Sequence, residues 1–149
     1  MQVIRSLERD DATLVGWGVR VLLLSAEGEF GLTGRRLVSL GGRVEAVGEL
    51  FEALSALIDD PSGYALFVLD CDGASVGGLQ AARRGIQMLG GDAGRVPVIL
   101  VSRECREQRF PEDRLDPTIL RAPLSSVALR VGFEHALRDR FYHNLTETA

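Results

Sequence analysis

The stretch Leu66 to Gly73, LFVLDCDG, leads from four apolar residues directly into two acidic residues, Asp70 and Asp72, and a glycine. A short, continuous apolar run that ends in turn residues is typical of a strand covered on both faces. Such strands occur in parallel sheets, which carry their functional groups where the strands end. The stretch therefore predicts a buried strand that places the Asp70 carboxylate at one edge of a sheet.

On either side of this stretch, strand-like and helix-like segments alternate. Apolar runs predict strands over 19–25, 43–47, 64–70, 96–102 and 118–123. Apolar residues at helical spacing predict helices over 29–42, 49–60, 77–91 and 125–145, whereas the polar segment 103–117, with two prolines, predicts a short or irregular helix. This alternation predicts an α/β fold with a doubly wound, five-stranded parallel sheet and helices on both faces.

The sequence also predicts the buried face of the first helix and the cap of the last helix. In the first helix, Phe30, Leu37 and Leu40 are expected on one buried face. Ser125 or Ser126 is expected to cap the start of the last helix, because a serine hydroxyl can accept a hydrogen bond from a free backbone N–H group there.

Composition limits the class of protein. The 149 residues predict one domain over 19–145, with an amino-terminal extension (1–18) and a short tail (146–149). No apolar run is long enough to span a bilayer and the amino terminus lacks a signal-peptide pattern, which predicts a soluble, cytoplasmic protein. A net charge of −4 argues against DNA as a direct partner. All 17 basic residues are arginine, so no mechanism here can use a lysine.

The chain from Val19 to Tyr142 resembles the chemotaxis-type receiver domain of bacterial response regulators, the phospho-acceptor module of two-component systems and phosphorelays. The order of elements carries the resemblance, together with Gly78-Leu79, which lie eight and nine residues beyond Asp70. The resemblance implies a flavodoxin-like sheet in the order 2-1-3-4-5. It also implies that Asp70 is the candidate phospho-acceptor and that Ser102 occupies the switch position.

The site departs from the family pattern at positions that hold charge. Where receivers have an acidic pair for magnesium, this chain has Ser25 and Ala26, and where they have a lysine it has Ala122. Magnesium prefers carboxylate ligands in octahedral geometry. We therefore expect no cofactor and no metal site, with only weak magnesium binding. Glu27 and Asp72 are residual acids, and the alternative is that they support an atypical phosphorylation of Asp70.

A rival interpretation comes from a different class of protein. The LDCDG segment is similar to the D-x-D-G signature of haloacid-dehalogenase-like phosphatases, in which Asp70 would be the nucleophile and Asp72 the general acid or base. That signature normally opens its domain, whereas here two strands precede it. The sequence therefore favours a receiver-like protein that is not an enzyme.

The function expected from the sequence is that of a stand-alone, degenerate receiver: a protein-interaction module in two-component-type signal transduction. Its partner is expected to be another signalling protein, bound through the last strand and helix, and a homodimer is allowed. Two questions stay open. Cys71 and Cys105 follow strands that should be neighbours, so the two thiols can lie close together. Apolar residues of the extension can pack on the domain or on a second subunit: Ile4, Leu7, Leu14, Val15 and Trp17.

Overall fold

Five parallel strands form one sheet in the order β2-β1-β3-β4-β5. We describe this protein from a computed structural model, which covers residues 18–138. The strands are β1 (Arg20–Leu24), β2 (Arg43–Val47), β3 (Leu66–Asp70), β4 (Val98–Ser102) and β5 (Thr118–Arg121). The predicted number, direction and order of the strands are confirmed, and each strand lies within its predicted segment.

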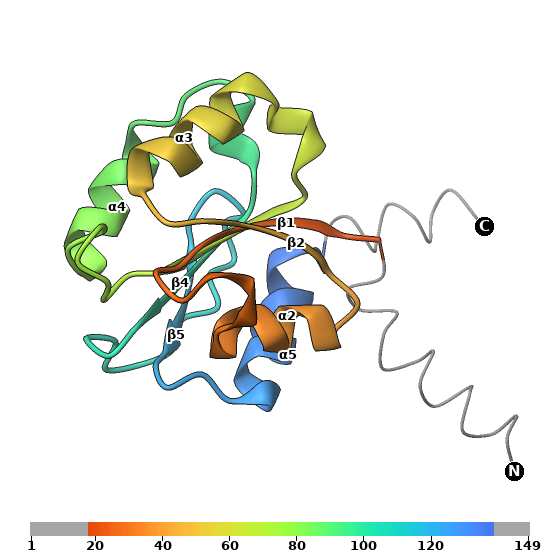
Figure 1. Cartoon of the computed structure of the whole chain (residues 1–149), viewed down its shortest axis with the longest axis vertical. Coiled ribbons are helices and arrows are strands. Elements are labelled where there is room, and N and C mark those ends of the chain that lie inside the picture. The colour runs from red at the N-terminus through yellow and green to blue at the C-terminus, as the bar shows by residue number, and fades with distance from the viewer. Residues whose placement is uncertain (1–17, 139–149) are drawn as a thin grey trace, which may run out of the picture.

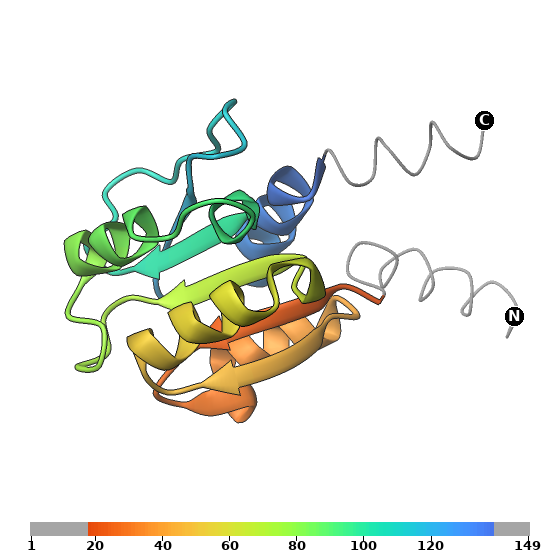
Figure 2. The same cartoon turned by 90° about the horizontal axis from the view of Figure 1, so that it is seen from above.

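Within residues 18–138, four α-helices cover the sheet, two on each face (Figures 1 and 2). The helices are α2 (Leu32–Ser39) and α5 (Ser126–Ala136) on one face, and α3 (Leu50–Asp59) and α4 (Leu79–Gln87) on the other. Short 3-10 turns η1 (Gly28–Phe30), η2 (Pro61–Gly63) and η3 (Ala93–Arg95) join them. The Ser125 hydroxyl accepts a hydrogen bond from the backbone N–H of Ala128, so the predicted cap of α5 is confirmed.

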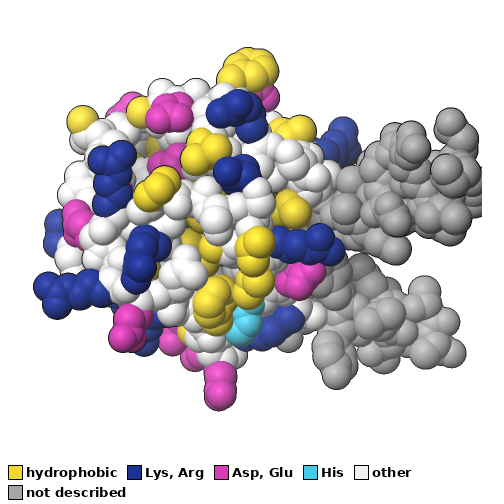
Figure 3. Space-filling model, turned by 90° about the horizontal axis from the view of Figure 1, so that it is seen from below, with side chains coloured by type: hydrophobic (Ala, Val, Ile, Leu, Met, Phe, Trp, Pro, Cys, Tyr) yellow, Lys and Arg dark blue, Asp and Glu magenta, His cyan; other side chains and the backbone are white. Residues whose placement is uncertain are grey.

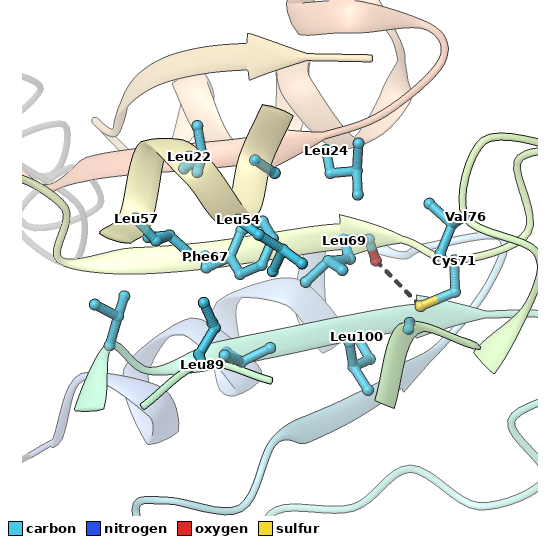
Figure 4. Packing of buried hydrophobic residues seen from close by; sticks show 14 of the residues in the cluster. Leu22, Leu24, Leu54, Leu57, Phe67, Leu69, Cys71, Val76, Leu89 and Leu100 are labelled. Carbon is cyan, nitrogen blue, oxygen red and sulfur yellow. Dashed lines mark hydrogen bonds between the residues drawn. The ribbon is translucent and has the colours of Figure 1, made fainter. Parts of the chain in front are cut away.

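The core consists of two apolar layers, one on each side of the sheet. Strands β1 and β3 pair with Leu22 beside Phe67 and Leu23 beside Val68. Because successive side chains of a strand point to opposite faces, Leu22 and Phe67 pack toward α3 and α4 (Figure 4), and Leu23 and Val68 pack toward α2 and α5. All four side chains are fully buried. Each contributes about 1.5–3 kcal/mol through burial.

The prediction that Phe30 lies on a buried helix face is wrong, because its side chain is 80% exposed. Phe30 belongs to η1, and Gly31 interrupts the helical backbone between η1 and α2 with φ −71° and ψ 176°. The helical phase therefore restarts at Leu32. Leu37 and Leu40 are buried as predicted, since they lie in or directly after α2.

The prediction of a short or irregular helix over 103–117 is wrong, because this segment forms a loop along the outer edge of β5. The backbone groups of Arg109 and Ile119 exchange two hydrogen bonds in an antiparallel bridge. The guanidinium of Arg121 donates to the carbonyl groups of Cys105 and Arg106 in the same loop. The two prolines and the many charged residues explain why a helix is replaced by these scattered contacts.

The carboxyl end of α5 holds the far part of this loop. Arg138 donates to the carbonyl groups of Glu112, at 2.5 Å, and Pro111, at 3.3 Å. The Nε2 atom of His135 lies 2.5 Å from the same Pro111 oxygen, and the ring of His135 contacts Phe110 edge-on. Loop and helix are therefore joined by side chains of α5.

Some sequence predictions fall on residues that the structure does not describe. The extension over 1–17, with Ile4, Leu7, Leu14, Val15 and Trp17, lies outside the described residues, and so does everything beyond residue 138. The domain boundaries at 18 and 145 and the tail over 146–149 stay predictions. In the described part of the chain, no helix is long and apolar enough to cross a bilayer.

Gly34 and Gly48 provide a matched test of the contact between η1 and α2. A Cβ atom at Gly34, in α2, would lie 2.2 Å from the backbone oxygen of Glu29, whereas one at Gly48 would meet nothing within 4 Å. We expect Gly34→Ala to lower the free energy of unfolding by about 1–3 kcal/mol through overpacking. Gly48→Ala should change it by less than about 1 kcal/mol, in the stabilising direction. Urea unfolding measures both, and equal losses would contradict the tight contact between η1 and α2.

Candidate functional site

An open cleft of about 350 Å³ lies at the carboxyl ends of the strands. Residues that follow β1 and β5, and the last residue of β3, meet there because the strands are parallel and end at the same edge of the sheet. The cleft brings together most of the site residues that the sequence predicts: Ser25, Ala26, Glu27, Asp70, Asp72 and Ala122. Ser102 is buried at the end of β4 and reaches this group through Asp72.

Asp70 is a half-buried carboxylate at the end of β3. The hydroxyl of Thr33 donates to its Oδ1 atom at 2.8 Å. Burial raises the pKa of Asp70 above its ordinary value, hydrogen bonds from Ser25 and Thr33 oppose this rise, and the charges of Glu27 and Asp72 add to it. Asp70 therefore binds a proton more readily than an exposed aspartate does.

Thr33 is a site residue that the sequence reasoning missed. It lies in the first turn of α2 and is buried against the end of β3. The available signal is its position: a helix that follows β1 in a parallel sheet begins beside the carboxyl edge, so a hydroxyl in its first turn can reach Asp70.

Asp72 joins the loop after β3 to the loop after β4. Its Oδ1 atom accepts a hydrogen bond from the Ser102 hydroxyl at 2.6 Å, and its Oδ2 atom accepts one from the backbone N–H of Arg103 at 2.7 Å. The Ser102 oxygen in turn accepts from the backbone N–H of Glu104. Both carboxylate oxygens of Asp72 are therefore engaged within the protein, in charge-assisted hydrogen bonds.

The end of β5 presents a small apolar side chain to the cleft. Ala122 lines it, while the neighbouring Arg121 extends its guanidinium to the loop carbonyls of Cys105 and Arg106. Alternation along the strand explains this difference. Among the described residues that line the cleft, Arg103 is the one with a basic side chain.

The resemblance to receiver domains raises the question of whether magnesium fits here. Within residues 18–138, no group of three or more His, Cys, Asp or Glu side chains could hold a metal ion. Asp70 is a single, half-buried carboxylate, Asp72 already accepts two hydrogen bonds, and Glu27 is an exposed residue at the rim. Magnesium requires near-octahedral coordination by oxygen atoms and depends on carboxylates for affinity. The residues present do not fit such an ion.

The two cysteines are buried free thiols, and neither forms a disulfide. Both belong to the apolar layer between the sheet and the helices α3 and α4. The Cys71 sulfur donates to the carbonyl oxygen of Leu69 (Figure 4). Burial raises the pKa of the Cys71 thiol to about 12 and also raises that of Cys105. Because the thiolate is the reactive form, these cysteines are inert packing residues.

The sheet order, the helices on both faces and the acid at the end of the central strand together define the receiver-domain fold. No family model and no curated protein matches the sequence. Among solved structures, the receiver domain of the sensor histidine kinase PA1611 from Pseudomonas aeruginosa PAO1, which holds a magnesium ion in its active-site cleft, matches with a TM-score of 0.60 and 20% identity. The match covers 80% of this chain and 98% of that one.

Two PhyR proteins have a similar fold. The anti-anti-sigma factor PhyR from Bartonella quintana matches with a TM-score of 0.57 and 18% identity, and the response regulator PhyR from Brucella abortus with 0.56 and 16%. The matches cover 99% and 98% of this chain but only 58% and 59% of the PhyR chains. At these identities, the likeness establishes the fold.

Asp70 and Asp72 should respond in opposite ways to the same substitution. Because folding raises the pKa of Asp70 above 3.8, the native state keeps this proton to a higher pH than the unfolded chain does, and the stability that the proton provides is lost as the pH rises through the folded pKa. The ionised carboxylate therefore costs stability at neutral pH. Asp70→Asn should therefore stabilise the protein at neutral pH, and this gain should vanish as the pH falls below 3.8. Asp72→Asn should destabilise it by about 1–3 kcal/mol, because an amide nitrogen cannot accept one of the two hydrogen bonds.

Urea unfolding of both variants and the unchanged protein, at neutral pH and near pH 3.8, measures these effects. A loss of stability in Asp70→Asn at neutral pH that equals the loss in Asp72→Asn would contradict the difference between the two sites.

Proposed function

We propose that this protein is a degenerate receiver: an interaction module of two-component-type signalling that works without magnesium-dependent phosphorylation of Asp70. One observation carries the proposal. The cleft lies at the carboxyl ends of the strands and is lined by Ser25, Ala26 and Ala122, at the positions where the resemblance to receivers leads us to expect charged side chains. Transfer of a phosphoryl group depends on positive charge that neutralises the group as it moves.

The electrostatics of the cleft support this proposal. A phosphoryl group on Asp70 would add negative charge between Glu27 and Asp72, two acids whose charges already act on Asp70. The chain contains no lysine that could compensate, and Arg121 is held by the loop carbonyls at the edge of β5, so the basic side chain at the cleft is that of Arg103 alone among the described lining residues. Phosphorylation is therefore disfavoured both by poor magnesium binding and by like charge.

The contacts of Ser102 support an output that does not depend on phosphorylation. Its buried hydroxyl already donates to Asp72 and accepts from Glu104 N–H, so it has no free hydrogen for an incoming group. Asp72 thus joins the ends of β3 and β4 through its carboxylate. We infer that the loops at this edge keep one arrangement and present a constant surface to a partner.

The exposed face of α5 fits the expected partner surface. Val127 is 74% exposed and Val131, one turn further on, is 46% exposed. Between them lies Arg130, which pairs with Glu134. Figure 3 shows hydrophobic side chains among scattered charges on one side of the molecule.

Apolar side chains framed by charge are typical of protein interfaces. The partner we propose is another signalling protein, as the fold shared with the anti-anti-sigma factor PhyR suggests. Since the segment between β4 and β5 contains no helix, we propose that α5 and this loop together form the partner surface.

The phosphorylation proposal is tested with acetyl phosphate, magnesium and intact-protein mass spectrometry. The unchanged protein should gain no phosphoryl group and should bind magnesium at millimolar dissociation constants or weaker. The triple variant Ser25→Asp, Ala26→Asp, Ala122→Lys should gain one, and adding Asp70→Asn to it should abolish the gain.

Phosphorylation of the unchanged protein at Asp70 would contradict the proposal. If the unchanged protein hydrolyses small phosphate esters and the Asp70→Asn variant does not, the result would instead support the interpretation as a haloacid-dehalogenase-like phosphatase.

The α5 surface is tested with matched charge insertions. Val127→Arg should weaken binding to the signalling partner about tenfold or more, since a central interface contact contributes over 1 kcal/mol. Ile58→Arg on α3 is the control, because Ile58 is 59% exposed but lies on the opposite face. Arg138 is unsuitable for such a test because it anchors the loop. Calorimetry with the partner measures both, and equal weakening would exclude α5 as the interface.

A further inference from the structure

A second hollow lies at the opposite end of the sheet from the cleft, where β3 and β4 begin. This groove measures about 580 Å³. It is bounded by the residues before β3 and β4 and by the last turn of α5, and its mainly apolar lining includes Tyr64, Ala65, Val96, Pro97, Ala136 and Leu137. Its size lies in the range of sites that hold a ligand or a large side chain.

The base of the groove is formed by buried apolar residues, and its edge is formed by small, partly exposed residues. Leu137 and Val96 are buried, whereas Ala65, Pro97 and Ala136 are only partly covered. Small side chains at these three positions leave the space that a larger group could fill. Ser62 and Asp92 also line the groove and provide hydrogen-bond acceptors beside the apolar surface.

The described chain enters the sheet next to this groove. The carbonyl oxygen of Arg20, the first residue of β1, accepts a hydrogen bond from the backbone N–H of Ala65 at 2.9 Å. Figure 2 shows that β1 begins and α5 ends at the same end of the domain. Trp17 precedes Arg20 by three residues, a distance of at most about 11 Å of extended chain.

We propose that this groove is the docking site of the protein's own amino-terminal segment, residues 11–17, with the indole of Trp17 as its anchor. Trp17 is the one tryptophan of the chain, and Leu14 and Val15 lie close to it in sequence. A buried tryptophan needs an apolar pocket and an acceptor for its N–H group, and this groove offers both.

The short connection favours this occupant over a second copy of the protein. A tether of three residues costs little closure entropy and gives an effective concentration in the millimolar range. A separate molecule would have to compete with that concentration. Docking here also leaves the cleft and the α5 surface free, so the inference does not depend on the proposed function.

The single tryptophan makes the test direct. Compared with the protein unfolded in urea, the folded full-length protein should show emission shifted to shorter wavelength and a several-fold smaller acrylamide quenching constant, both unchanged on dilution. Ala65→Arg and Ala136→Arg, which fill the groove, should return both signals toward the unfolded values. Ala74→Arg is the matched control, because Ala74 is exposed in the loop between β3 and α4. Circular dichroism confirms that each variant is folded.

Three results would overturn the proposal: an emission in the unchanged protein equal to that of the unfolded chain, a shift that disappears on dilution, or a shift retained in a folded groove variant. A dilution-dependent shift would identify a second copy as the occupant. If neither groove variant folds, the probe is the dye anilinonaphthalene sulfonate. Its fluorescence should rise several-fold when residues 2–17 are deleted, and an unchanged signal would overturn the proposal.

Discussion

Burial of the sheet on both faces decides where polar chemistry can lie in this protein. The interior residues of β1, β3 and β4 contact helices on either side and are almost completely removed from water. A polar group in the middle of such a strand would lose its hydration without replacement. Ser25, Asp70 and Ser102 therefore stand at or just beyond strand ends, where hydroxyls, backbone amides and solvent can satisfy them.

Two aspartates separated by one residue have different roles because their surroundings differ. Asp70 accepts a hydrogen bond from Thr33 of α2, while both carboxylate oxygens of Asp72 accept hydrogen bonds from residues at the end of β4. Both acids line the cleft, but they differ in how far the protein's own hydrogen bonds engage their carboxylate oxygens. The Asp72 carboxylate joins the loops after β3 and β4 through these two hydrogen bonds.

The five strands and the four described α-helices were predictable because their signals are local and periodic, whereas the polar segment 103–117 has no such signal and its predicted helix is a loop. Sheet order came from the resemblance, and it held because the apolar runs that become β1, β3 and β4 fit only the centre of such a sheet. Phe30 was placed wrongly because a single extended glycine, Gly31, reset the helical phase. The bond between Asp72 and Ser102 joins residues 30 positions apart, and such loop contacts leave no trace in spacing.

The loop that crosses β5 has a consequence for how other chains can approach. In β5, the outward-facing N–H groups of Ile119 and Arg121 bond to the Arg109 carbonyl and to the Gln108 side chain, and the Ile119 carbonyl bonds to Arg109 N–H. No free backbone donor of these two residues is left to pair with a foreign strand. The sheet therefore cannot be extended from β5 into a shared sheet or a fibril, and recognition on this side must rely on side chains.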